Sequence, residues 1–274
     1  MSVRLCALWL ILVVCGVIVG AKPKLDPIAL MNKSDAAYYY PSGHGVNDLA
    51  VDLVIDRMAN DAIMKQVQIT YYYAGVDQQR FSISNYPEKF AKKRDELQSL
   101  VDPLSEYIMP RPSALTFTGF TLSVEEAFRM IAGCAGKKFY QIIGTPKGET
   151  NGVKEYRVLI DETGLAHQVE NVLKDGGSII AGIENVQIKD SWHIAKVTTR
   201  LMSSSNVQWK IDRVEYGEVE GYSLPTKLVT QYRNNYGQPV EGATDFTITL
   251  QNYRINKGVA AAVFAATKPQ PATK

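Results

Sequence analysis

The sequence predicts an α+β fold dominated by a large antiparallel sheet. Apolar and polar residues alternate in many short segments, which is the period of a half-buried strand. Turn residues separate those segments at a spacing of about 10 to 15 positions, which suits hairpins. Between residues 87 and 137 the pattern changes to charged and helix-forming residues. A mainly antiparallel β structure with a helical insertion accounts for all three observations.

The N-terminus has the features of a secretory leader. Arg4 supplies a positive charge, residues 5–20 are nearly all apolar, and Val19-Gly-Ala21 fits a small-residue cleavage site. The apolar run is roughly 16 residues long, shorter than the ~20 that a membrane-spanning helix needs. We therefore expect residues 1–21 to be a cleaved signal peptide and the protein to be periplasmic or secreted. Two alternatives are an uncleaved N-terminal anchor and lipidation at Cys15, which lies in a poor lipobox.

The mature chain is expected to be nearly neutral and free of disulfides. The formal net charge is +2, and loss of Arg4 with the leader reduces it to +1. A chain so close to neutral is not expected to bind nucleic acid through electrostatic attraction. Cys6 and Cys15 lie in the leader, so Cys134 has no intramolecular partner after cleavage. The remaining residues must therefore be held together by their core.

A helix and three strands are predicted to open the mature chain. Asp26 and Pro27 suit the N-cap and first turn of a helix that runs to about Tyr38, followed by a loop to Gly45. Strict alternation then predicts strands at residues 49–55, 66–73 and 80–84.

Residues 87–137 are predicted to be a helical insertion. The segment 87–109 is charged and helix-forming, and Pro103 is expected to kink or end its helix. Ser123-Val-Glu-Glu126 has the pattern of a capping box, which predicts a second helix through Phe128 and Ile131.

The C-terminal half is predicted to be a series of hairpins. The expected strands are residues 139–144, 156–160, 167–173, 179–189, 192–201, 208–216, 227–232 and 244–255. Residues 259–274 are rich in Ala, Pro and Lys, which predicts a flexible tail. We thus expect one domain over residues 22–258.

No motif for catalysis is present in the sequence. It contains no nucleophile elbow, phosphate-binding glycine loop or Cys/His pairing with metal spacing, so we predict no enzyme activity, no cofactor and no metal. The histidines at 44, 167 and 193 are far apart in sequence and are interpreted as loop or strand polar residues. The acid pairs Glu125-Glu126 and Asp161-Glu162 are interpreted as helix-start and turn residues.

Tyrosine is abundant on the predicted strand faces. Tyr71 and Tyr73 share a face with Val67 and Ile69, and Tyr156 shares one with two aliphatic residues. A sheet with such a face either covers it with helices or uses it to bind something apolar. A plain core between sheet and helices explains most of these residues.

The C-terminal strands carry motifs with a recognisable order. They are Tyr216, Gly221, Leu224-Pro225, Tyr253, Ile255-Asn256, Gly258 and Phe264. This order resembles the LolA/LolB-like family of periplasmic lipoprotein carriers and outer membrane lipoprotein-sorting relatives. The resemblance implies an unclosed β-barrel, or half-barrel, whose concave face is covered by helices that enclose an apolar cavity for acyl chains. The insertion at 87–137 is longer than in a minimal carrier, and the family's functional arginine has no counterpart that we can assign.

The resemblance predicts a monomeric protein that binds a lipid or an acylated lipoprotein in the half-barrel. The expected cavity residues come from the apolar strand faces: Val67, Ile69, Tyr71, Phe81, Ile83, Tyr156, Val158 and Ile160. A sensor or scaffold that binds an envelope protein partner through the same fold is the first alternative. It is favoured if Leu97, Leu100, Leu104 and Phe128 fill the cavity. The second alternative is an exported hydrolase, which requires a histidine close to a serine or carboxylate in a cleft.

Overall fold

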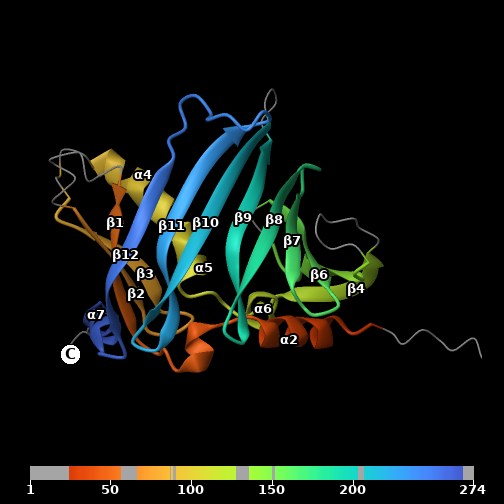
Figure 1. The fold of residues 1–274 in the computed structure, drawn as a ribbon, viewed down its shortest axis with the longest axis horizontal. Helices are drawn as coiled ribbons and strands as arrows, with labels where there is room; N and C mark the ends of the chain where they lie inside the picture. The colour runs from red at the N-terminus through yellow and green to blue at the C-terminus, as the bar shows by residue number, and fades with distance from the viewer. Residues whose placement is uncertain are drawn as a thin grey trace, which may run out of the picture.

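One curved sheet forms the body of the protein (Figure 1). The computed structural model describes residues 25–56, 67–86, 88, 91–127, 136–149, 152–202 and 207–267. Within them, twelve strands follow the order β3-β2-β1-β12-β11-β10-β9-β8-β7-β6-β5-β4. Every neighbouring pair is antiparallel. β3 and β4 are the two edges, so the sheet is not closed into a barrel, and the expected fold class is confirmed. The predicted leader lies outside the described residues.

The strand bounds follow the alternating pattern of the sequence. They are β1 Leu49–Ile55, β2 Gln68–Tyr73, β3 Gln79–Ser84, β4 Phe120–Ala127, β5 Phe139–Pro146, β6 Val153–Asp161, β7 Ala166–Leu173, β8 Ser178–Ile188, β9 Ser191–Met202, β10 Val207–Val219, β11 Tyr222–Asn234 and β12 Phe246–Ile255. Consecutive strands pair as hairpins from β4 to β12, and β12 then pairs with β1. Through this last pairing, the N-terminal strands β1 to β3 extend the sheet that the C-terminal half of the chain forms.

Short helices occupy one side and one end of the sheet. They are α2 Pro27–Ala37, η1 Pro41–His44, α4 Ala91–Val101, η4 Asp102–Leu104, α5 Ser105–Ile108, α6 Ser113–Thr116 and α7 Val259–Ala266. In Figure 1, α4 and α5 lie behind the long strands, and α2 and α6 lie along the lower end. Among the described residues, no helix combines the length and the hydropathy that a membrane crossing requires.

The predicted helix at Ser123 is wrong, because residues 120–127 form strand β4. β4 pairs with β5 through partners such as Leu122↔Gly144 and Val124↔Ile142. Its side chains alternate between half-buried and exposed along most of the strand. The alternation of apolar and polar residues therefore outweighs the capping-box pattern, which is short and local. Phe128 and Ile131 lie outside the described residues.

The start of the predicted tail is helix α7. Its first turns are anchored to the body, because the Asp48 carboxylate accepts a hydrogen bond from the Ala261 amide at 2.7 Å. The Arg80 guanidinium also lies 5.2 Å from the centre of the Phe264 ring, within reach of a cation–π contact. Residues 268–274 lie outside the described ranges.

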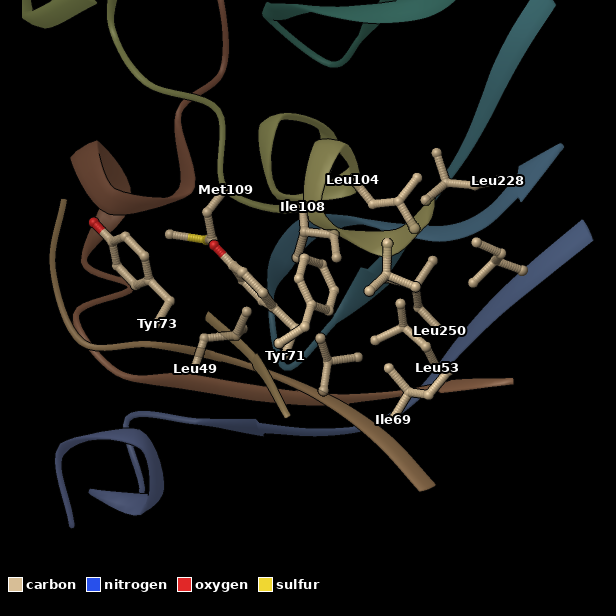
Figure 2. Packing of buried hydrophobic residues seen from close by; sticks show 14 of the residues in the cluster. Leu49, Leu53, Ile69, Tyr71, Tyr73, Leu104, Ile108, Met109, Leu228 and Leu250 are labelled. Carbon is tan, nitrogen blue, oxygen red and sulfur yellow. The ribbon is translucent and has the colours of Figure 1, made fainter. Parts of the chain in front are cut away.

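The larger of two cores lies between the N-terminal half of the sheet and the α4–α5 segment. Figure 2 shows Ile108 and Met109 close to Leu49 and Tyr71, with Leu104 farther along the same core. These five side chains are at most 4% exposed. A smaller core forms at the other end of the sheet, around Met31, Ile142, Ile160 and Ala166. The half-barrel is therefore filled at one end.

Candidate functional site

A cavity of about 530 Å³ lies between the two cores. Its walls come from the α2–η1 segment, from residues 103–117, and from strands β6 to β11. Aromatic and aliphatic side chains dominate the lining, which includes Phe117, Tyr156, Val158, Ile183, Trp192 and Tyr216. This volume falls within the range of small-molecule sites, roughly 300 to 1,000 Å³.

The loop after α2 forms one wall because it is tied to strand β9. Tyr38 makes a parallel β-bridge with Trp192, and the Tyr39 amide donates a hydrogen bond of 2.9 Å to the Trp192 carbonyl. The loop then turns through η1 and ends at Gly45, whose φ of 95° is accessible at low cost to glycine. Three consecutive tyrosines are thus held against the cavity.

The tyrosines present their rings to the cavity, while their hydroxyl groups are engaged elsewhere. The Tyr38 hydroxyl donates to Asn185 Oδ1 at 2.9 Å, and that of Tyr216 donates to the Ile194 carbonyl at 3.1 Å. The Tyr39 hydroxyl accepts from the Ser223 amide at 3.3 Å. Burial raises the pKa of Tyr38 to about 12, so its hydroxyl is neutral at physiological pH. The lining is therefore more apolar than its tyrosine content suggests.

Asp35 joins the two helical segments that border the cavity. One carboxylate oxygen accepts from the Tyr40 hydroxyl at 3.0 Å and from the Ser113 amide at 2.7 Å. The other accepts from the Ala114 amide at 3.0 Å. Asp35 on α2 thereby caps the first turn of α6, whose own N-cap residue, Pro112, offers no side-chain bond.

Charged groups at the cavity are balanced. Lys210 forms an ion pair of 2.9 Å with the buried Asp212, which also accepts a hydrogen bond of 3.1 Å from the Tyr107 hydroxyl. Glu106 and Arg111 also line the cavity, are exposed and carry opposite charges. The site therefore has no excess of cationic side chains that would mark it for a strongly anionic ligand.

His193 is the least expected feature of the wall. It lines the cavity and is 4% exposed. Its ring stacks on Tyr39 with a centroid distance of 5.0 Å and meets Tyr216 edge-on at 4.6 Å. Burial lowers the pKa of His193, and the backbone of Ser191 offsets only part of that effect. The imidazole is therefore neutral at pH 7.

The structure divides the sequence-predicted cavity residues into two groups. The N-terminal group belongs to the larger core and is covered by the α4–α5 segment: Val67, Ile69, Tyr71, Phe81 and Ile83. In the C-terminal group, Tyr156 and Val158 line the cavity, whereas Ile160 is buried in the smaller core. Strand register brings the first group together, through pairs such as Tyr71↔Phe81, but not next to the second group.

Sequence reasoning missed most of the wall. The Tyr38–Tyr40 loop and the 103–117 segment come from positions without a strand-like alternation, and Trp192 was expected only as the first residue of a strand. The run of three tyrosines beside Pro41 was the one available signal, because bulky aromatic residues in a loop need a surface to cover them.

The hydrolase alternative requires a histidine close to a serine or carboxylate in a cleft. His167 lies 3.0 Å from the Asp161 carboxylate, but this carboxylate also accepts bonds from Thr163 and Leu165 in the β6–β7 turn and from Lys137 before β5. Neither His167 nor Asp161 lines the cavity. His193 does line it, yet no serine hydroxyl or carboxylate that the structure describes is bonded to its ring.

The fold and the cavity define a half-barrel that holds a partly open, mainly apolar space. Comparison with known proteins finds two weakly similar solved structures. No family model matches the chain, and no curated protein matches it significantly. A LolA superfamily protein from Nitrosomonas europaea has a TM-score of 0.37 at 9% identity, covering 85% of this chain and 94% of that one. A domain from Vibrio parahaemolyticus, with a proposed role as an outer membrane lipoprotein-sorting protein, has the same TM-score and identity and is covered over 93% of its length.

Proposed function

We propose that this protein is a non-catalytic, exported carrier of the cell envelope that holds a lipid, or the acyl chains of a lipoprotein, inside its half-barrel. The observation that carries the proposal is the cavity of about 530 Å³, lined mainly by aromatic and aliphatic side chains. Export follows from the predicted leader, and a role in lipoprotein trafficking follows from the C-terminal motifs. Burial of acyl chain in such a space contributes about 0.8 kcal/mol per CH₂.

Entry of a ligand is passive in this proposal. The walls formed by α2, η1 and α6 are short segments. The Tyr38–Trp192 bridge holds the α2–η1 segment to strand β9, and the Asp35 cap ties α6 to α2. A shift of these segments would open the cavity without disturbing the sheet. Among these segments α6 has no buried residue, so local opening is expected to be least costly there.

Filling the cavity provides the test. Val169 lines it on β7, whereas Val172 on the same strand does not. Val169→Trp is expected to block uptake of a neutral fluorescent apolar probe and to remove any lipid that copurifies with the wild-type protein in native mass spectrometry. Val172→Trp, the matched control, is expected to keep both. Absence of probe uptake and of copurifying lipid in the wild type would refute the proposal.

A scaffold that binds an envelope protein partner is a second candidate, favoured by one observation. Leu97 and Leu104 of the α4–η4 segment are buried in the larger core, where they fill one end of the half-barrel. The cavity beyond them distinguishes the candidates, because a pure scaffold has no use for it. A protein that retains its envelope partner with Val169→Trp in place, while losing lipid, would support the scaffold.

A further inference from the structure

The cavity opens along the 103–117 segment. Its exposed lining residues are Pro103, Glu106, Arg111 and Thr116, all from that segment. The lining residues that the strands and the α2–η1 segment supply are buried or half-buried. The mouth of the cavity therefore lies at the 103–117 segment, and the strands form its floor.

The floor includes an aliphatic strip across three neighbouring strands. Val158 on β6 and Val169 on β7 are register partners, and both line the cavity. Ile183 on β8 also lines it and lies two residues beyond Ala181, the β8 partner of Val169. These aliphatic side chains contact methylene groups by dispersion and carry no group that could hydrogen-bond a polar headgroup. The strip therefore suits a hydrocarbon chain.

The mouth is polar and carries charges of both signs. Glu106 and Arg111 line the cavity there, and both are exposed. A charged headgroup that is buried without a partner loses its hydration at a high cost, whereas at the mouth it stays in contact with water. A lipid is therefore expected to enter with its chain first and to leave its headgroup beside these two residues. With one acid and one base at the mouth, the net charge of the headgroup is not what the site distinguishes.

The volume of the cavity limits how many chains it can cover. The cavity measures about 530 Å³, its mouth included. A methylene group occupies roughly the share of one molecule in liquid water, about 30 Å³, so at most about 18 methylene groups fit. Two chains of about 16 carbons each would need about 960 Å³, nearly twice that space. One long chain therefore fills the cavity and leaves no room for a second.

We propose that the half-barrel holds a single acyl chain of about 16 to 18 carbons, with the headgroup of the lipid at the mouth beside Glu106 and Arg111. The class of ligand is a one-chain lipid such as a lysophospholipid. A second or third long chain of the same lipid would stay outside the cavity, in contact with water. This inference rests on the proposed lipid-binding function and specifies its ligand.

The experiment uses a series of lysophosphatidylethanolamines, with chains from about 10 to about 22 carbons, as competitors of a neutral fluorescent apolar probe bound to the full protein. Each lipid is kept below its critical micelle concentration. Affinity is expected to rise about fourfold with each added CH₂ and to level off at about 16 to 18 carbons, where the cavity is full. Native mass spectrometry with the lipid of about 16 carbons is expected to show one lipid per protein.

Val169→Ala connects the chain-length limit to the cavity. It removes two methyl groups from the floor, so affinity is expected to level off at chains about two carbons longer. Val158→Ala, which removes the same groups on β6, replaces it if Val169→Ala does not fold. Val172→Ala is the matched control, because Val172 lies on β7 but does not line the cavity, and it should keep the wild-type limit.

Failure of the inference and failure of the proposed function give different results. The one-chain limit is overturned, and lipid binding left intact, by a probe that binds together with any of three outcomes. These are an affinity that levels off below about 14 carbons or keeps rising beyond about 20, two lipids per protein, or an unchanged limit in Val169→Ala. A wild-type protein that does not bind the probe overturns both.

Discussion

Asp161 shows how one buried carboxylate can organise the end of the half-barrel. Its side chain is fully buried, and it accepts hydrogen bonds from the backbone and hydroxyl of Thr163 and from the Leu165 amide. Lys137 and His167 complete its surroundings at 2.9 and 3.0 Å. Burial by itself would raise the pKa of Asp161, but these hydrogen bonds outweigh burial and hold the pKa well below its usual range.

The turn that Asp161 closes also receives helix α2. At Gly164, where φ is +96°, an added Cβ would lie 3.0 Å from the Lys33 carbonyl oxygen. Glycine is therefore required both for the turn and for the close approach of the helix. The sequence predicts Asp161-Glu162 as turn residues, but it could not show that Lys137, which precedes β5, and His167, on the next strand, converge on this one carboxylate.

We expect Asp161→Asn to destabilise the protein by about 2 to 3 kcal/mol at pH 7, because a buried ion pair loses its anion and an amide cannot satisfy the same donors. The depressed pKa of Asp161 means that its contribution is present above the unfolded-state value of about 3.9 and is lost as the pH falls below it. The stability difference between wild type and variant should therefore shrink between pH 5 and pH 3 in chemical denaturation.

Glu162→Gln, at the exposed neighbouring position, serves as the control and should change stability by less than about 0.5 kcal/mol. A difference between wild type and Asp161→Asn that stays constant across this pH range would contradict the assigned role.

At the scale of elements, alternation was the dependable signal. It predicts every strand except β4. At β4, a four-residue capping pattern at Ser123 predicts a helix, whereas the alternation of Phe120, Leu122 and Val124 with polar residues matches the strand that the structure shows. Helix α2 was predicted correctly from Asp26 and Pro27, and the structure shows the Asp26 carboxylate accepting from the Ile28 amide at 2.9 Å. A sequence pattern can predict a cap within one helix, but it cannot predict a cap that one element provides for another.

The Asp35 contact is such a cap between elements. Asp35→Ala is expected to cost about 1 kcal/mol, as for other lost caps, and to increase hydrogen exchange at the Ser113 and Ala114 amides specifically. Asp26→Ala removes a cap of the same chemistry within α2 and should leave those two amides as protected as in the wild type. Equal exchange at Ser113 in both variants would show that Asp35 does not hold α6.

At the scale of the whole molecule, two consequences of the chain path were beyond the sequence. The pairing of β12 with β1 separates the N-terminal strands from β6 in the sheet. The apolar faces of β2–β3 and of β6 have the same alternation but are covered by different parts of the chain. The face on β2 and β3 is covered by α4 and α5, while Tyr156 and Val158 face the cavity. Alternation predicts which residues share a face, but it cannot predict which face a helix covers.

This division predicts that the filled half of the half-barrel supplies stability and that the hollow half supplies binding. Val101 and Val169 allow a matched comparison, since the first is fully buried in the larger core and the second lines the cavity. Val101→Ala is expected to cost about 1.5 to 2.5 kcal/mol, because it removes packed methyl groups and leaves a void. Val169→Ala should cost less than about 1 kcal/mol, because its methyl groups already border empty space.

Chemical denaturation measures the stability of each variant, and titration with the neutral apolar probe measures its binding. Val101→Ala should leave probe affinity within about twofold of the wild type, because the cavity lies outside the core that this residue stabilises. Equal destabilisation by the two variants would mean that the cavity is packed closed in solution. The molecule would then be a filled half-barrel throughout, and the scaffold would become the better account of its function.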